Sequence, residues 1–449
     1  MTDATAGQTP PRRGGLLELD ARTRRRNAAE ARFRLYGLIA VGIGMLALVL
    51  LLISVLSSGL GAFRQTSLHL DVTLSEKALD KTGSRDPEVM KKVTTITYGK
   101  LLEEALAKTI EEKGIAIDGL SKTDIKDMIS KDAAARVRDR VLANPDLIGQ
   151  TVPFTVLANG RIDGYLKGRV TMESAQRDSN VSPNQLLLAD ALRADGTLYK
   201  AFNWAFITAP DASELRPEAA GLGVAILGSA YMMIVVLCLS LPLGVATSIY
   251  LEEFAPKNRI TDLIEVNISN LAAVPSIVFG ILGLAIFINF AGLPQSAPIV
   301  GGLVLTLMTL PTIIISTRAA LKAVPPSIRD AALGIGASKM QSIFHHVLPL
   351  AMPGILTGTI IGLAQALGET APLLLIGMVG FIASNYPDGV ASGFLDPNSA
   401  MPAQIFEWAK RADPAFYERA WGGIIILLVF LAIMNITAII LRRRFERRW

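Results

Sequence analysis

"DAALGIGASKMQSIFHHVLPLAMPGI" (Asp330–Ile355) is a half-polar stretch that lies between two long apolar ones. Apolar residues recur at helical spacing on both sides of Gly336, from Ile328 to Ile335 and from Met340 to Val347. We therefore expect two short amphipathic helices, joined by a turn in which Gly336 adopts a left-handed conformation. Helices this short are not stable alone in water, so another surface must cover their apolar stripes.

Capping residues mark the ends of both helices. Pro325-Pro326-Ser327 ends the preceding segment and offers a serine N-cap, and Ser338 with Gln341 forms a capping box for the second helix. Pro349 and Pro353 are expected to end that helix and to start the next membrane span. The pattern alone does not decide which surface covers the apolar stripes. It is the bilayer, the chain's own helical bundle or a groove on a cytoplasmic partner.

The rest of the chain is dominated by long apolar runs. The chain has 449 residues, of which 51% are hydrophobic. Six runs of about 18 or more residues are apolar enough to cross a bilayer as helices. They are Leu35–Leu56, Gly221–Tyr250, Val266–Phe290, Ile299–Thr317, Ile355–Ile382 and Trp421–Leu441. The sequence therefore predicts an all-α polytopic membrane protein with six transmembrane helices.

The basic residues predict the orientation of these spans. Arginines are concentrated in the two tails, whereas the loop Ala291–Pro298 contains neither lysine nor arginine. Cytoplasmic loops carry the excess of positive charge, so both termini and the quoted stretch are expected in the cytoplasm. The net charge of +5 then reflects topology and contact with membrane lipid, and we expect no nucleic-acid partner.

The same reading divides the chain into five parts. They are a basic cytoplasmic tail (1–34), a first transmembrane helix (35–60), an extracytoplasmic α+β domain (61–218), a transmembrane core (219–441) that contains a cytoplasmic loop (318–352), and a second basic cytoplasmic tail (442–449). The small α+β domain thus lies between spans 1 and 2.

Local patterns in 61–218 predict its elements. They indicate a strand over Leu68–Leu74, a helix over Thr97–Lys113 that ends at Gly114 in a C-cap position, and a helix over Lys122–Leu142. They also indicate a hairpin at Asn159-Gly160 and a helix to Leu192 that Ser182 and Gln185 open with a capping box. No Gly-rich phosphate loop, histidine–carboxylate metal spacing or G-x-S-x-G elbow occurs there. The chain has one cysteine and three scattered histidines, so we expect no metal site and no catalytic residues.

The quoted stretch resembles the signature loop of ABC-importer permeases. That loop reads E-A-A, three residues, G, nine residues, I-x-L-P, and here it is Asp330-Ala331-Ala332, Gly336 and His346-x-Leu348-Pro349. Asp330 replaces the glutamate and His346 replaces an apolar residue. The resemblance implies that the loop inserts into a cleft of a separate ATPase subunit, through Asp330, Ala331, Ala332, Gly336, Met340, Phe344, Leu348 and Pro349. This chain has no P-loop, so a partner must bind and hydrolyse ATP, and the chain itself is not expected to be an enzyme or to hold a cofactor.

Three further stretches are similar to motifs of the permease subunits of phosphate importers. They are "VPSIVFGILGL" (Val274–Leu284), "ALGETAPLL" (Ala366–Leu374) and "MPAQIFEWAKRADPAFYERAW" (Met401–Trp421). The resemblance covers the chain from about Gly221 onward, and the 61–218 domain resembles an insertion found in some bacterial members. It implies half of a translocation pathway in the bacterial inner membrane. The implied partners are two ATPase copies, a second related permease subunit, an extracytoplasmic phosphate-binding protein and phosphate itself.

Glu369 is an acidic residue inside the predicted fifth span. A carboxylate at that depth is costly and is either a satisfied structural group or part of the substrate pathway. The family commonly has arginine where this chain has Gln365 and Ile315, and paired hydrogen bonds from arginine suit phosphate. Arg318 is a possible substitute, and Glu369 is expected to neutralise an arginine or to accept a proton. The expected pathway residues are Glu369, Thr370, Gln365 and Arg318.

Three other functions remain open at this point. One is a permease for another oxyanion such as sulfate or molybdate, which the "GETAP" and "QIFEWA" stretches disfavour. Another is a non-transporting membrane subunit that senses phosphate, and only uptake measurements separate it from a transporter. The last is a membrane enzyme acting through 61–218, which the lack of a nucleophile–base pair disfavours.

Overall fold

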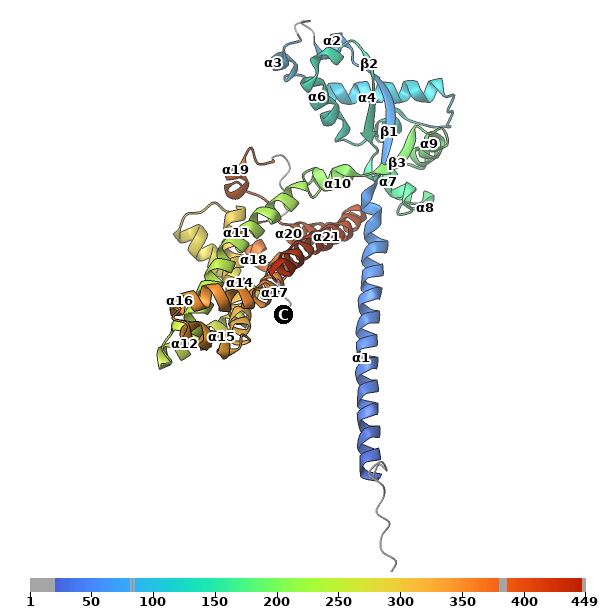
Figure 1. Cartoon of the computed structure of the whole chain (residues 1–449). Coiled ribbons are helices and arrows are strands. Elements are labelled where there is room, and N and C mark those ends of the chain that lie inside the picture. Colours follow the sequence, from blue (N-terminus) through green and yellow to red (C-terminus); the bar gives the residue numbers. More distant parts are fainter. Residues whose placement is uncertain (1–20, 81–82, 84, 379–385, 446–449) are drawn as a thin grey trace, which may run out of the picture. The chain divides into compact units, whose positions relative to one another are not determined.

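The computed structural model describes residues 21–80, 83, 85–378 and 386–445. The chain separates into two compact units, with the division after Val55. The first unit contains most of helix α1 (Ala21–Gly59), which runs through the predicted first span (Figure 1). Its side chains are exposed along almost the whole apolar stretch, as expected for a helix that faces lipid.

In the described residues, five helices are long and apolar enough to cross a membrane, and one bent pair raises the number to as many as six. The bent pair joins Arg259–Ala272 to Ser276–Phe290 at an angle of 101°. The predicted third span, Val266–Phe290, is therefore two helices and not one. The break lies before Pro275, which cannot donate a backbone hydrogen bond and restricts the residue before it.

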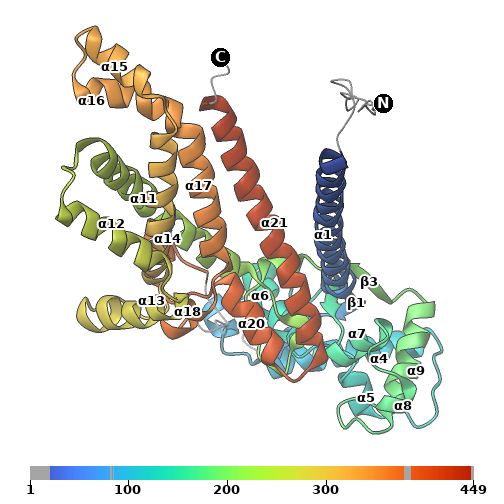
Figure 2. The ribbon, with the colours of Figure 1, turned by 90° about the horizontal axis from the view of Figure 1, so that it is seen from below.

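The second unit holds the remaining apolar helices. They are α11 (Gly223–Ile249) with the π-helix η4 (Tyr250–Phe254), α12 (Arg259–Ala272), α13 (Ser276–Gly283) with η5 (Leu284–Phe290), α14 (Pro298–Lys322), α17 (Leu348–Gly368), α18 (Ala371–Leu375), α19 (Val390–Leu395), α20 (Met401–Lys410) and α21 (Pro414–Phe445). Helix α14 packs against both α11 and α17, and Figure 2 shows it between them. Val300, Val304 and Leu305 of α14 are fully buried there.

Small residues let these helices approach closely. A Cβ atom added to Gly302 of α14 would lie 2.5 Å from Cβ of Val235 on α11. A Cβ atom on Gly228 would overlap the backbone carbonyl of Ser399 and lie 2.6 Å from Oδ1 of Asn398. Helix packing in membranes depends on such contacts, because lipid tails are as apolar as the side chains.

Replacing Gly228 by alanine is expected to destabilise the core by about 2 kcal/mol, because the added methyl group meets backbone that cannot move away cheaply. Thermal unfolding in detergent, followed by tryptophan fluorescence, should show a lower Tm. Gly44→Ala is the matched control, since a Cβ atom there has nothing within 4 Å. Equal Tm values for the two variants would contradict the close approach.

The domain that follows α1 contains a three-stranded antiparallel sheet of order β2-β1-β3. The strands are β1 (Arg64–Thr73), β2 (Thr151–Leu157) and β3 (Leu198–Phe202). The predicted strand over Leu68–Leu74 is confirmed, but β1 begins four residues earlier and ends one residue earlier than predicted. Its leucines face a core that also contains α4 (Thr95–Glu112). The strand was predictable because apolar and polar residues alternate along it with a period of two.

Short helices complete this domain. They are η1 (Leu60–Phe63), α2 (Glu76–Leu79), α3 (Pro87–Met90), α5 (Lys122–Lys126), α6 (Ala133–Ala143), η2 (Pro145–Leu147), α7 (Gly160–Leu166), α8 (Met172–Ala175), α9 (Pro183–Ala194), α10 (Trp204–Thr208) and η3 (Pro217–Ala219). The capping box at Ser182 and Gln185 is confirmed, and so is the left-handed glycine that follows α4, Gly114, at φ +62.

Two predictions in this domain are wrong. The helix expected over Lys122–Leu142 is interrupted between α5 and α6, because Ile129 pairs with Ala158 beside the sheet. Asn159-Gly160 forms no hairpin turn. Asn159 caps α7 by accepting a hydrogen bond from the Arg161 N–H, and a Cβ atom on Gly160 would lie 2.8 Å from Oε2 of Glu218. The glycine is required by packing and not by a turn.

Candidate functional site

The quoted stretch folds as a helix–turn–helix at one end of the helical core. Helix α15 (Pro326–Gly334) is followed by Gly336 at φ +88, as predicted. Helix α16 (Lys339–Ser342) begins with the predicted capping box: the Ser338 N–H donates to Oε1 of Gln341 at 2.9 Å, and the Gln341 N–H donates to Oγ of Ser338 at 3.2 Å. Ser327 does not cap α15, because the helix already begins at Pro326.

The second helix of this loop does not end at the prolines. Helix α16, the π-helix η6 (Ile343–Val347) and α17 form one continuous helix over Lys339–Gly368. The expectation that Pro349 and Pro353 end a helix is therefore wrong. The π turn ends at Val347, two residues before Pro349, so the hydrogen-bond pattern changes close to a proline that has no N–H to donate. The second helix of the loop and the predicted fifth span as far as Gly368 are consequently one continuous helix.

The apolar stripe of the loop is divided between two environments. Ile343 and Val347 are fully buried against the ends of the core helices, together with Leu321. Met340 and Phe344 remain 56% and 46% exposed. One side of the helix thus packs on the chain's own bundle, which is one of the three covering surfaces that the sequence left open. The other side remains uncovered.

The uncovered residues form what we call the apolar ledge: Leu333, Ile335, Met340 and Phe344, all exposed. Ile335, at the turn, is 84% exposed. Of the other predicted coupling residues, Asp330 and Ala331 are exposed, Gly336 forms the turn, Leu348 and Pro349 are half-buried, and Ala332 is buried. Exposed apolar patches of this kind mark interaction sites.

An arginine fixes the ledge on the core. Arg329 of α15 donates from Nη2 to Oε1 of Glu253 at 2.7 Å and from Nε to the same oxygen at 3.0 Å. The same guanidinium donates to the backbone carbonyls of Leu321 and Val324 at the end of α14. Because Glu253 is almost buried, this bonding holds α15 in one orientation relative to α14 and η4.

Arg318 lies on α14 and is already paired. Its Nη2 donates to Oε1 of Glu265 at 2.7 Å, and its Nε lies 3.4 Å from Oε2 of Glu252. Lys322 lies 3.5 Å from that same Glu252 oxygen. A guanidinium that two carboxylates neutralise offers little attraction to an anion.

Glu369 occupies a break between helices. Helix α17 ends at Gly368, Glu369 is extended at φ −75 and ψ 130, and α18 begins at Ala371. Glu369 and Thr370 are half-buried, while Gln365, one turn earlier, is exposed. The predicted fifth span to Ile382 is thus discontinuous, and its last residues lie outside the described ones. Irregular backbone at membrane depth is tolerated where it lines a cavity or is buried in protein.

The structure does not bring Arg318 and Glu369 together. Helices α14 and α17 are antiparallel neighbours, and Gly358 packs on Ser316, close to Arg318 in the chain. Glu369 lies eleven residues beyond Gly358, which corresponds to about 16 Å of helix axis. Arg318 is therefore not the partner of Glu369.

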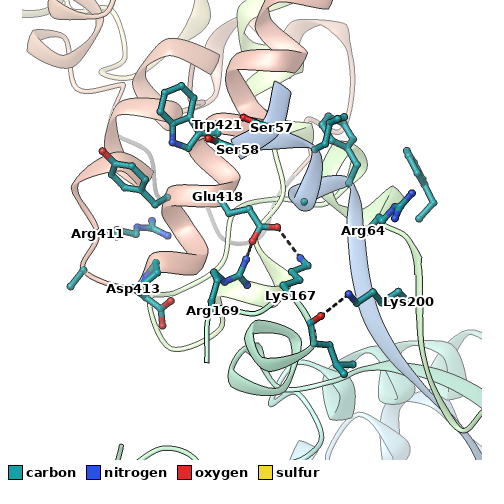
Figure 3. Close-up of a pocket in the computed structure, with 18 residues that line it drawn as sticks. Ser57, Ser58, Arg64, Lys167, Arg169, Lys200, Arg411, Asp413, Glu418 and Trp421 are labelled. Carbon is teal, nitrogen blue, oxygen red and sulfur yellow. Dashed lines mark hydrogen bonds and ion pairs between the residues drawn. The ribbon is translucent and has the colours of Figure 1, made fainter. Parts of the chain in front are cut away.

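A buried charge cluster that sequence reasoning missed joins the 61–218 domain to α21. Glu418 of α21 pairs with Lys167 at 2.9 Å and with Arg169 (Figure 3). Asp163 also pairs with Lys167, at 2.8 Å. Burial lowers the pKa of Lys167 to about 8, although the Asp163 carboxylate acts in the opposite direction. Burying charges is tolerated here because each has an opposite partner.

The next residue of α21 extends this connection. Arg419 is 4% exposed and donates to the backbone carbonyls of Ala220 and Glu218 and to Oε1 of Gln65. The buried Glu218 side chain accepts a hydrogen bond from Oγ of Ser130 at 2.5 Å, and burial raises its pKa. The adjacent charges Glu418-Arg419, directly before an apolar run, were the sequence signal that could have revealed the cluster.

Two family models match this chain. "Binding-protein-dependent transport system inner membrane component" matches residues 240–449, which include the loop and Glu369. "Domain of unknown function (DUF3333)" matches residues 20–176. Among solved structures, an inward facing conformation of the MetNI methionine ABC transporter aligns with 51% of this chain and 95% of that chain, at 15% identity and a TM-score of 0.37.

Curated relatives align over the helical half of the chain. The probable ABC transporter permease protein YqgI of Bacillus subtilis (strain 168) is 30% identical over 230 residues, which are 49% of this chain and 78% of the relative. The phosphate transport system permease protein PstA 1 of Mycobacterium tuberculosis (strain CDC 1551 / Oshkosh) is 32% identical over 230 residues, which are 51% of this chain and 73% of the relative. This chain therefore belongs to the PstA family of phosphate ABC transporter permeases.

Proposed function

We propose that the chain is a permease subunit of an ATP-driven importer of inorganic phosphate and forms half of its translocation pathway. The names of its PstA relatives support the substrate. The apolar ledge is the observation that supports coupling to an ATPase. It is exposed, it is held on the core by Arg329, and its second helix continues into a membrane helix. A separate ATPase subunit covers the ledge and is coupled to this chain through residues 325–349.

The complete transporter contains a second related permease, two ATPase copies and an extracytoplasmic phosphate-binding protein. The chain lies in the bacterial inner membrane, with tails 1–34 and 442–449 and the loop 318–352 in the cytoplasm. The 61–218 domain is extracytoplasmic, and residues 35–60 and 219–441 contribute the membrane spans. We infer that the partner binds and hydrolyses ATP, which agrees with a sequence that contains no G-x-x-x-x-G-K-[ST] P-loop.

The continuous helix supports a mechanical account of coupling. Lys339–Gly368 is about 45 Å long at helical rise, so it can carry a displacement of the ledge through most of a bilayer. The helix ends directly before Glu369, where the backbone is extended. Closure of the ATPase then moves the break at Glu369, while the Ile343–Val347 packing acts as the pivot.

Purification through this subunit tests the proposed function. An ATPase and a second permease should co-purify, and phosphate with its binding protein should stimulate ATP hydrolysis. Sulfate and molybdate in the same assay separate a phosphate importer from one for another oxyanion. Normal initial rates of phosphate uptake in cells that lack this chain would instead indicate a sensor.

Glu369→Gln is expected to lower the phosphate uptake rate about tenfold, equivalent to about 1.4 kcal/mol, because the amide cannot accept a proton or neutralise a cation at the helix break. Uptake of radiolabelled phosphate by cells that express equal amounts of protein measures the effect. Glu173→Gln, an exposed residue of the 61–218 domain, is the matched control. Undiminished transport by Glu369→Gln would remove Glu369 from the pathway.

A further inference from the structure

A cavity of about 1230 Å³ lies where the 61–218 domain meets α21 (Figure 3). Aromatic side chains from several elements line part of it, namely Phe63, Phe202, Tyr417 and Trp421. Five cationic side chains also line it, namely Arg64, Lys167, Arg169, Lys200 and Arg411, together with the two carboxylates of Asp413 and Glu418. An apolar wall beside a basic one is the lining that an anionic, amphiphilic ligand requires.

Most of these cations are neutralised by carboxylates, but two are not. Lys167 and Arg169 pair with Glu418, and Arg411 pairs with Asp211 at 2.7 Å. Within the part of the chain that the structure describes, Arg64 forms no ion pair, and Lys200 donates only to the backbone carbonyl of Leu166 at 2.7 Å. The cavity therefore has an excess of positive charge on its β1–β3 side.

Arg64 and Lys200 are placed to act together. In the β1–β3 register Arg64 is opposite Phe202 and Thr66 is opposite Lys200, so Arg64 and Lys200 are diagonal neighbours on one face of the sheet. Diagonal neighbours lie about 7–8 Å apart, a spacing that lets two long side chains converge on one tetrahedral anion. Burial and the neighbouring Arg193, Lys167 and Arg64 charges lower the pKa of Lys200, whereas Asp163 opposes this effect.

The cavity lies at the end of apolar helices. Ser57 and Ser58 follow the apolar run of α1, and Trp421 begins that of α21. Tryptophan and tyrosine are enriched at the boundary between lipid and water. Tyr417 and Trp421 therefore indicate that the cavity lies at this boundary. A ligand in the cavity can thus be reached from the lipid headgroups or from solvent.

We propose that this cavity binds a phosphate group between Arg64 and Lys200, with the aromatic side chains packed beside it. The group comes either from the headgroup of an anionic phospholipid or from inorganic phosphate, and the aromatic wall suits the acyl chains of the lipid. The site is independent of the transported substrate, because none of the ledge or Glu369 residues contributes to it.

The test compares the full-length chain with Arg64→Gln/Lys200→Gln in nanodiscs. The first arm tests the lipid as ligand. It uses discs of phosphatidylcholine with a minor fraction of phosphatidylglycerol, and native mass spectrometry measures how much phosphatidylglycerol the protein retains. Discs of phosphatidylcholine alone, titrated with radiolabelled inorganic phosphate, test the free anion. Lys77→Gln/Lys122→Gln is the charge-matched control, since both lysines are exposed on the same domain. Arg64→Lys/Lys200→Arg preserves the charge.

The double glutamine variant is expected to lose binding about tenfold or more, while the control and the charge-preserving variant retain it. Loss of retained phosphatidylglycerol identifies the lipid as the source, and loss of bound phosphate identifies the free anion. Both mutated side chains are exposed, so equal elution and Tm should confirm an intact fold. Equal binding by wild type and the glutamine variant in both arms, or no binding in either, would overturn the proposal.

Discussion

Replacing Phe344 by aspartate is expected to abolish phosphate uptake while leaving the membrane protein folded. The side chain is 46% exposed on the apolar ledge, so the change removes aromatic surface and places a charge where a partner must pack. Aromatic residues at the centre of an interface commonly contribute 2 kcal/mol or more, which corresponds to about 30-fold weaker binding. Co-purification of the ATPase and the phosphate uptake rate should both fall.

Ile96→Asp provides the matched control for this prediction. Ile96 is also an exposed apolar residue, at 71%, but it lies on α4 of the 61–218 domain. Uptake and ATPase association should be unchanged in that variant. If Phe344→Asp retained the ATPase and transported at the wild-type rate, the ledge would not be the coupling surface.

Replacing Glu418 by alanine is expected to destabilise the connection between the 61–218 domain and α21 by about 3 kcal/mol. The carboxylate is 11% exposed and pairs with both Lys167 and Arg169, so its removal leaves two buried cations with Asp163 as their remaining partner. Removing one partner of a buried ion pair lowers the free energy of unfolding by more than the intact pair contributes, because the other charge stays buried without its partner. A Tm lower by several degrees, and faster proteolysis between the two parts, should report the loss.

Glu173→Ala is the control for that measurement. Glu173 pairs with Arg177, but both side chains are about four-fifths exposed, and exposed pairs contribute little. Glu418→Gln should fall between the two, because the amide still accepts one hydrogen bond but carries no charge. A Tm for Glu418→Ala equal to that of the control would mean that the charge cluster does not hold the domain.

Local signals predicted local structure well. The capping boxes at Ser182 and Ser338 and the left-handed glycines Gly114 and Gly336 were all expected from a few neighbouring residues. These features depend on hydrogen bonds within one turn of helix, so the sequence nearby contains everything that determines them. The apolar spans were likewise expected, since composition over about 20 residues decides bilayer insertion.

Predictions that required knowledge of distant neighbours failed or stayed open. Asn159-Gly160 has the residues of a hairpin turn, but the packing of Glu218 on Gly160 favours a helix start. The stripe of the loop was identified correctly, yet only the bundle determines that Val347 is covered and Phe344 is not. Arg318 stays a predicted pathway residue, and only the fold shows that Glu252 and Glu265 pair with it.

The sequence by itself determined that this chain is a multi-span membrane protein whose loop forms a capped helix–turn–helix with ABC-permease spacing. The tertiary structure alone decided the broken helix before Glu369, the continuous helix through Pro349 and the charge cluster around Glu418. The physical reason is the distance along the chain between the groups that interact. Caps and apolar runs are satisfied by neighbours in the chain, whereas a buried charge is satisfied by partners that only folding brings within 3 Å.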